Sequence, residues 1–401
     1  MTVKQIYDLM NNVTSEVLGK TDLVAEDLSN VVDVGTEVFN ASAVDNYVKT
    51  LVNHIGKVVF VNRPYSGKIP SVLMDSWEFG SVLEKISCDT PAASENETWE
   101  LTNGTEYKQD IFYQPKVSAK FFNSKVTFEV PMSFTEKQVK ESFSNAAQLN
   151  GFISMIYNAV DRSMTIKIDS LVMRTINSMI AQTLNADKTA FAGGYGTAST
   201  ARCVNLLKLY NDKFFPATGS TANPDALTAD KAIYDPDFIR FASYTMGVYV
   251  DRLASISTLF NVGGKDRFTD AANLHVIMLS DFAKGADVYL QSDVRHNEMT
   301  RLPNYETIPY WQGSGQNYEF DSTSAINVKI DASTTVDIDG IVSVMFDRDA
   351  LGVSNLDRRV TTAYNAKAEF FNNYYKFDAG YFNDTNENFV VFFVSDAKTG
   401  S

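Results

Sequence analysis

The chain contains few of the residues on which redox and metal chemistry depend. Its 401 residues include 2 cysteines and 3 histidines. Cys88 and Cys203 lie far apart, which favours two reduced thiols over a disulfide. His54 falls in an expected helix, His275 falls in an expected buried strand, and His296 is distant from both. Three scattered histidines make a poor ligand set, so the sequence predicts no metal site.

Motifs that support catalysis are also missing. The sequence has no G-x-S-x-G, H-E-x-x-H or C-x-x-C pattern. The glycines of 192–197 are not followed by the Gly-Lys-Ser/Thr of a phosphate-binding loop. Residues 337–340 match part of a calcium loop but lack its other ligands. His296 has acidic neighbours, yet a surface or interface hydrogen bond is a simpler role for it than catalysis. We therefore expect no enzymatic activity and no cofactor.

Basic charge is in deficit. The 35 lysines and arginines oppose 49 aspartates and glutamates, which gives a formal net charge of −14 at pH 7. A surface of this charge does not neutralise phosphates over its whole area, so nucleic-acid binding is not a global property of the chain. The first residues lack the apolar run of a signal peptide. We expect a product that is made in the cytosol and contacts no membrane.

The most informative feature that is present is one long helical pattern. From Ser133 to about Leu184, apolar residues recur every three or four positions, and Gly151 is the only glycine. Ser133 and Glu136 match a capping box at its start. At 1.5 Å per residue an unbroken helix would span roughly 75 Å. Internal charges exclude a membrane span, and the spacing drifts too much for a coiled coil, so we expect an extended subunit.

Residues 76–131 are expected to form an extended arm of strands. Asn103-Gly104 predicts a hairpin with a type I′ turn. Alternating apolar and polar residues predict two further strands, at 116–121 and 125–130, and Pro131 is expected to end the second. The arm is too polar to have a core of its own. We therefore expect an adjacent subunit to order it, mainly over residues 90–110.

The remaining residues mix helices and strands, which is the pattern of an α+β fold. Residues 198–260 show helical spacing, with Pro224 and Pro236 in first turns. Residues 303–319 are expected to be a loop rich in aromatic residues and glycine. The other expected elements are helices at 3–18, 23–40 and 43–55, a strand at 58–61, strand-like residues at 77–86, a strand at 274–279 followed by a helix to 290, and strands at 326–330, 341–346, 364–381 and 389–394.

This order of elements resembles that of the major capsid proteins of tailed bacteriophages. A helical arm, a strand arm, a long helix, an α+β domain and closing strands span nearly the whole chain. Short segments in the last third of the chain also resemble the sequences of such capsid proteins, at 279–293 with 306–315 and at 347–353 with 364–382. None of these segments is a catalytic motif, so the resemblance implies an architecture and not a chemistry.

The architecture that the resemblance implies is α+β, with an N-terminal arm, an extended β-hairpin loop (E-loop), a long spine helix, a peripheral domain and an axial domain. The parts would fall as follows: an N-terminal helical arm at 1–75, the E-loop and peripheral strands at 76–131, the spine helix at 132–186, the axial domain at 187–360, and C-terminal strands that return to the peripheral domain at 361–401.

The implied function is that of a structural shell subunit of the virion. It would assemble with itself in the host cytoplasm into hexamers and pentamers of an icosahedral head, which encloses double-stranded DNA without sequence-specific binding. Scaffolding, portal and decoration proteins are implied partners. We take turn and aromatic residues as candidate inter-subunit contacts: Trp99, Asn103, Gly104, Tyr107, Phe112, Tyr113, Tyr310 and Trp311.

Two other functions stay open at this point. The first is an encapsulin-like nanocompartment shell of the same fold, which encloses protein cargo instead of DNA. The second is an acidic surface or binding protein with a helical stalk, which would be a soluble monomer or small oligomer. Only the two shell proteins form closed particles, and the nucleic acid content of the particles separates one from the other.

Overall fold

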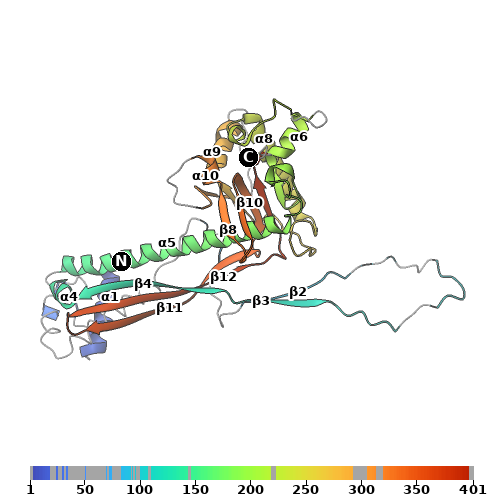
Figure 1. Ribbon diagram of the computed structural model, residues 1–401. Coiled ribbons are helices and arrows are strands. Elements are labelled where there is room, and N and C mark those ends of the chain that lie inside the picture. Colours follow the sequence, from blue (N-terminus) through green and yellow to red (C-terminus); the bar gives the residue numbers. More distant parts are fainter. Residues whose placement is uncertain are drawn as a thin grey trace. The chain divides into compact units, whose positions relative to one another are not determined.

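The computed structural model divides into two compact units, and Figure 1 shows their helices and strands. Unit 1 comprises residues 1–81, 124–172 and 353–380, and unit 2 comprises residues 82–123, 173–352 and 381–401. The structure describes residues 3–18, 24–25, 29–30, 33–34, 50, 69, 72–74, 83–91, 93, 95, 100–106, 110–142, 146–217, 223–291, 305–312 and 319–396.

Unit 1 is built on a four-stranded sheet of order β1-β11-β12-β4. β12 (Phe370–Asn383) pairs antiparallel with β4 (Lys125–Thr135), and β1 (Leu73–Met74) pairs parallel with β11 (Leu351–Asn365). Alternate residues of β12 are buried, which is the period of a strand with one face on a core. These buried residues are Phe371, Asn373, Tyr375, Phe377 and Ala379.

Helices α1 (Val3–Leu18), α4 (Glu136–Ser142) and α5 (Ala146–Ala186) accompany this sheet, with α5 drawn beside its strands in Figure 1. Phe134 of β4 meets Phe152 of α5 edge-on, with 5.5 Å between ring centroids. α1 occupies the predicted residues. The helices expected at 23–40 and 43–55 fall largely outside the described residues, and the strand expected at 58–61 falls wholly outside them.

The long helix is confirmed, but it begins at Ala146 and not at Ser133, and residues Glu136–Ser142 of the predicted helix form α4. α5 is continuous over 41 residues, or about 60 Å. Ser133 lies in β4, where its hydroxyl donates to Asn372. The reciprocal capping pair lies two residues later. The Gln138 amide donates to Thr135 Oγ1 at 3.2 Å, and the Thr135 amide donates to Gln138 Oε1 at 3.0 Å.

Pro131 does not end its strand, contrary to the prediction. It lies within β4, opposite Tyr374 of β12. β4 is an edge strand of the sheet as described. An edge strand tolerates proline because its outer side has no ladder bond to lose.

Unit 2 contains a five-stranded sheet of order β5-β13-β10-β6-β7. Its central strand β10 (Ile341–Asp347) is antiparallel to β13 (Phe389–Phe393) and to β6 (Leu274–Leu279). The edge strands β5 (Cys203–Asn205) and β7 (Tyr305–Ile308) run parallel to their neighbours. Every residue of β13 is buried, as expected of a strand that is covered on both faces.

Short helices and a small hairpin complete unit 2, together with a ribbon described below. They are η2 (Tyr195–Thr197), α6 (Leu206–Phe214), α7 (Ala229–Ala232), α8 (Pro236–Ala254), α9 (Ser280–Gln291), α10 (Phe320–Thr323), β8 (Ile326–Lys329) and β9 (Thr335–Ile338).

Several predicted elements of unit 2 are confirmed, among them β6 with α9 and β13. Pro236 is the first residue of α8, and the Asp235 carboxylate before it accepts from the Phe238 amide at 2.8 Å. Pro224 lies in a turn instead of a helix. The predicted loop at 303–319 contains β7, and β5 precedes the first helix of the segment 198–260, which the sequence pattern predicts to be helical throughout.

The units divide the chain at other positions than the resemblance implied. Residues 361–401 do not stay together, since 353–380 belong to unit 1 and 381–401 to unit 2. β12 pairs with β4 up to Gly380, whereas β13 is an inner strand of the five-stranded sheet. The first part of the strand arm, residues 82–123, also belongs to unit 2.

The displaced capping box can be tested by substitution. We expect Thr135→Ala to destabilise unit 1 by about 1 kcal/mol, because it leaves a first-turn amide of α4 without its acceptor. Amide exchange at Gln138 should accelerate. Ser133→Ala is the control, since Ser133 is exposed and its hydroxyl bonds the Asn372 side chain and not a helix amide. Equal effects of the two variants, measured by urea unfolding and hydrogen exchange, would contradict this assignment.

Candidate functional site

Unit 2 also contains a two-stranded ribbon that is separate from its five-stranded sheet. β2 (Leu83–Cys88) pairs antiparallel with β3 (Val117–Phe122), and Figure 1 shows that a long loop joins them. Directly paired residues share a face. The outer face therefore carries Glu84, Ile86, Cys88, Val117, Ala119 and Phe121. The inner face carries Leu83, Lys85, Ser87, Ser118, Lys120 and Phe122.

The apolar outer face of the ribbon is exposed to solvent, and the inner face with its two lysines is partly buried. All six outer-face residues are exposed, including Ile86 at 66%, Val117 at 61% and Phe121 at 62%. On the inner face, only Phe122 is fully buried, and the lysines are partly buried. The predicted alternation is confirmed in β3, but its apolar side faces solvent. A half-buried strand normally turns that side to the core.

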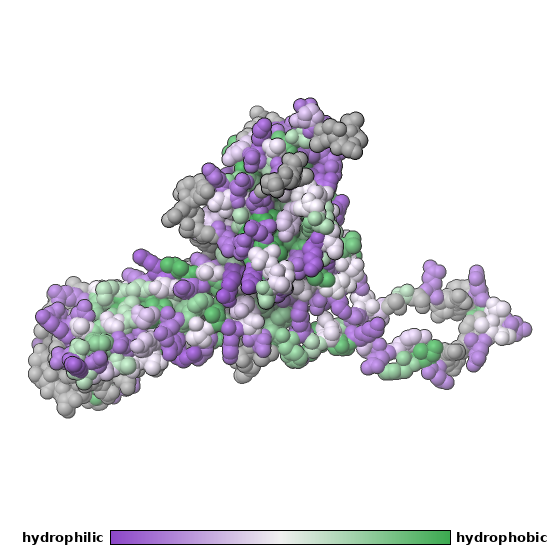
Figure 2. Space-filling view, in the orientation of Figure 1, coloured by the Kyte–Doolittle hydropathy of each residue, from purple (hydrophilic) through white to green (hydrophobic). Residues whose placement is uncertain are grey.

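The loop between the strands extends the exposed apolar surface. Phe112 and Tyr113 are 85% and 82% exposed, and Figure 2 shows apolar atoms along the outstretched loop. The predicted turn is present, since the Thr105 amide donates to the Thr102 carbonyl at 3.2 Å. Only Gly104 of its two central residues has a positive φ, at 90°. The turn is therefore type II, and the predicted type I′ is wrong.

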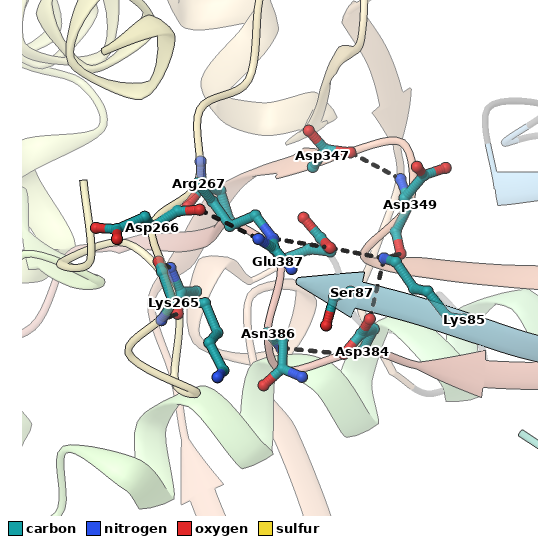
Figure 3. A network of polar contacts seen from close by, with 12 residues as sticks. Lys85, Ser87, Lys265, Asp266, Arg267, Asp347, Asp349, Asp384, Asn386 and Glu387 are labelled. Atoms are coloured by element: carbon teal, nitrogen blue, oxygen red, sulfur yellow. Dashed lines mark hydrogen bonds and ion pairs between the residues drawn. The ribbon is translucent and has the colours of Figure 1, made fainter. Parts of the chain in front are cut away.

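A polar cluster joins the inner face of the ribbon to the rest of unit 2, and Figure 3 shows most of its residues. The Asp384 carboxylate lies 3.0 Å from Lys85 Nζ and 2.9 Å from Lys120 Nζ. Lys85 Nζ also lies 2.7 Å from Glu387 Oε1. The Asp384 side chain is only 1% exposed. We call Lys85, Lys120, Asp384 and Glu387 the ribbon root.

Further contacts surround the ribbon root. Arg267 Nε donates to Glu387 at 3.1 Å, and Lys265 pairs with Asp89 at the end of β2, at 2.5 Å. Phe122 packs against Phe382 with 5.0 Å between ring centroids. The ribbon is thus held through charge and one aromatic contact, whereas its exposed apolar surface lies on the other side.

The charges of Asp384 and Lys85 persist over a wide pH range. Burial alone would raise the pKa of Asp384, but Lys120 and Lys85 more than offset it and hold that pKa below 3.8. Burial would lower the pKa of Lys85, and Glu387 and Asp384 raise it above 10.5. The stability from Asp384 is lost only as pH falls below its unfolded value through the lowered pKa. The stability from Lys85 is lost only as pH rises through the raised one.

The sequence-predicted contact residues fall into different environments. Trp99 and Tyr107 lie outside the described residues. Asn103 and Gly104 form the exposed turn, with Phe112 and Tyr113 in the same loop, and Tyr310 is partly buried.

Trp311 is a correction. It is 1% exposed, and its Nε1 donates to the Ile341 carbonyl at 2.8 Å. It belongs to the core of unit 2 and is not available for a contact with another subunit.

Sequence reasoning missed the ribbon root. The signal was the position of Lys85 and Lys120, each inside a strand and on the face opposite the apolar residues. Nothing in the sequence indicated that Asp384 and Glu387, more than 260 residues later than Lys120 and in a turn, would meet them. Their meeting depends on tertiary structure.

The described residues contain no group of three or more His, Cys, Asp and Glu side chains that could hold a metal ion. His54 and His296 lie outside them. His275 packs against Phe346 with its ring tilted, and 5.9 Å separates the ring centroids. Within the described structure, neither of its ring nitrogens has a hydrogen-bond partner. Among the helices that the structure describes, none is long and apolar enough to cross a membrane.

The ribbon leaves an apolar face uncovered, and an exposed apolar patch of this kind marks an interaction surface. The comparisons give the family. The model of the Phi29-like phage major capsid protein matches residues 10–393. The chain therefore belongs to this family, and it is a structural major capsid protein of tailed phages. A comparison with curated proteins finds no match.

A solved capsid structure agrees with this fold. A chain in the capsid structure of Staphylococcus phage Andhra has a TM-score of 0.50 at 7% sequence identity, and the match covers 83% of this chain and 86% of that one. A chain in the structure of the head fibre and inner core protein gp22 of bacteriophage P68 has a TM-score of 0.48 at 8% identity, with 82% and 85% covered. Because the family model spans residues 10–393, the nanocompartment and the stalk protein are the less favoured functions.

His275 makes unit 2 sensitive to mild acid. Burial and the Arg348 charge hold its pKa below 6.5. Its unfolded form therefore gains a proton first, and stability present above pH 6.5 falls as pH drops toward the lowered pKa. We expect His275→Phe, which keeps the ring but cannot titrate, to remove a slope of at most about 1.4 kcal/mol per pH unit. Identical pH dependence of thermal unfolding in wild type and variant would contradict this.

Proposed function

We propose that copies of this chain form the hexamers and pentamers of an icosahedral phage head, with each ribbon lying on an adjacent copy. The observation that supports this is the exposed apolar outer face of the ribbon. Ile86, Val117 and Phe121 are exposed on a strand pair whose inner face is already occupied by unit 2. Fully burying such a side chain contributes about 1.5–3 kcal/mol. A second copy supplies the missing cover.

The loop adds to the same contact in this proposal. Phe112 and Tyr113 are large aromatic residues, which are enriched at the buried centres of interfaces. Trp99, Asn103, Gly104 and Tyr107 belong to the same stretch of chain, and Tyr310 is the one candidate outside it. Many modest interfaces of this kind close a shell by symmetry, because each copy offers and receives the same contacts.

The remaining partners follow from the family and from charge. The head would enclose double-stranded DNA without sequence-specific contacts, and the net charge of −14 disfavours tight binding to packed DNA. Assembly would take place in the host cytoplasm, with separate scaffolding, portal and decoration proteins. The chain itself would catalyse no reaction, because its role in the head would be structural.

The outer face carries its own reporter, Cys88. Cys88 is exposed and Cys203 is buried, and burial raises the pKa of the Cys203 thiol, which suppresses its thiolate. We expect a maleimide to label Cys88 rapidly in the unassembled chain and at least about tenfold more slowly in closed particles. Mass spectrometry of the labelled peptides measures both rates. Equal labelling in chain and particle would show that the outer face is not covered.

Loop aromatics provide a second test of the same contact. We expect Phe112→Ser with Tyr113→Ser to leave the unfolding temperature of the isolated chain unchanged, because both side chains are already exposed. The yield of closed particles should fall about tenfold or more, as about 1–2 kcal/mol is lost at each contact. Phe112→Leu with Tyr113→Phe is the matched control that keeps apolar area. Electron microscopy and sedimentation give the yields, and full assembly of the serine variant would reject the role.

A further inference from the structure

The inner face of the ribbon carries an electrostatic conflict of its own. Lys85 and Lys120 face each other directly across β2 and β3. Like charges in this position destabilise a strand pair. The neighbouring inner-face pair, Ser87 and Ser118, share a hydrogen bond of 3.0 Å and add no charge. The ribbon on its own would therefore be weakest at the pair of lysines.

Asp384 removes this conflict from outside the ribbon. Its two carboxylate oxygens are divided between the lysines, Oδ2 at 3.0 Å from Lys85 Nζ and Oδ1 at 2.9 Å from Lys120 Nζ. One carboxylate thus joins both strands of the ribbon to the turn that follows β12. Figure 3 shows this turn beside β2, with Lys85 reaching to both Asp384 and Glu387.

The turn that holds Asp384 is fixed independently of the lysines. The Asp384 amide donates to the Ala350 carbonyl at 2.7 Å, and Asp384 Oδ1 accepts from the Asn386 amide at 3.1 Å. Asn388 and Asp347 anchor the other end, since the Asp347 amide donates to the Asn388 carbonyl at 3.0 Å. These hydrogen bonds hold the Asp384 carboxylate in place, so Lys85 and Lys120 must approach it to form their ion pairs.

A buried carboxylate also restricts where the ribbon can point. If the ribbon swung away, Asp384 would lose both of the cations that it contacts in its buried position, and breaking a buried ion pair is costly. Glu387 does not replace them, since it carries the same sign. The ion pair of Lys265 with Asp89, the residue after β2, also opposes movement of the ribbon.

We propose that Asp384 is the positioning residue of the ribbon: by bridging Lys85 and Lys120 it fixes the direction in which the outer face is offered to the next copy. This inference rests on the proposed function, in which the ribbon covers an adjacent subunit. It adds that the direction is already set in the unassembled chain. Assembly then begins with an ordered ribbon root and loses less conformational freedom on contact.

The test measures ribbon direction and assembly separately. Spin labels on native Cys88 and on Ala332→Cys, an exposed position at the tip of the β8–β9 hairpin, give a distance distribution within the unassembled full-length chain. We expect a narrow distribution in the otherwise unchanged chain. Asp384→Ala should widen it about twofold and lower the yield of closed particles about tenfold. Lys120→Met should act in the same direction.

Two controls keep the outcome clear. Glu129→Gln removes an ion pair between β4 and β12 of unit 1, where Lys376 Nζ lies 3.2 Å from Glu129, and should change neither quantity. Asp384→Asn keeps the shape of the side chain and replaces Asp384→Ala if the latter fails to fold, as judged by near-ultraviolet circular dichroism. An unchanged distribution overturns the proposal, and so does a widened distribution with normal particle yield.

The proposed function fails in a different way. Failure of the unsubstituted chain to form closed particles, or unhindered labelling of Cys88 within them, would refute the contact between copies. The width of the distance distribution would still decide whether Asp384 holds the ribbon.

Discussion

The ribbon of β2 and β3 depends on one constraint: its polar face is used inside the chain, so its apolar face is left for something else. Asp384 and Glu387 occupy the inner face through Lys85 and Lys120. Ile86 and Phe121 therefore remain in water in the single chain. Two strands with a solvated apolar face have little stability of their own. Under the proposed function, the other copies of the chain in the shell would cover this face.

The two units differ in how their sheets are buried. Unit 2 has a sheet in which β13 is buried on both faces, which is a conventional core. Unit 1 has a sheet with alternate burial along β12, accompanied by the first part of α5. The unbroken 41 residues of α5 give the chain a stiff element. Rigid elements of this kind let many modest contacts between copies add without distortion.

Sequence reasoning predicted the elements whose signal is local and repeated. The apolar stripe of α5 and the continuous runs of β6 and β13 needed no tertiary information. The start of the helical region did, because Ser133-x-x-Glu136 and Thr135-x-x-Gln138 both match a capping box, and the second of them caps α4 ahead of α5. Pairing of β4 with Asn372, 239 residues from Ser133, extends the strand past the first of them. The same reason hid the ribbon root: lysines on a strand do not reveal a buried carboxylate more than 260 residues away.

The most direct test of the account is the structure of the assembled particle by electron cryo-microscopy. The account predicts closed icosahedral shells in which the outer face of each ribbon, with Ile86, Val117 and Phe121, is buried against an adjacent copy, while Asp384 still bridges the two lysines of its own chain. A shell in which that face remains in solvent, or folds back onto its own chain, would contradict it.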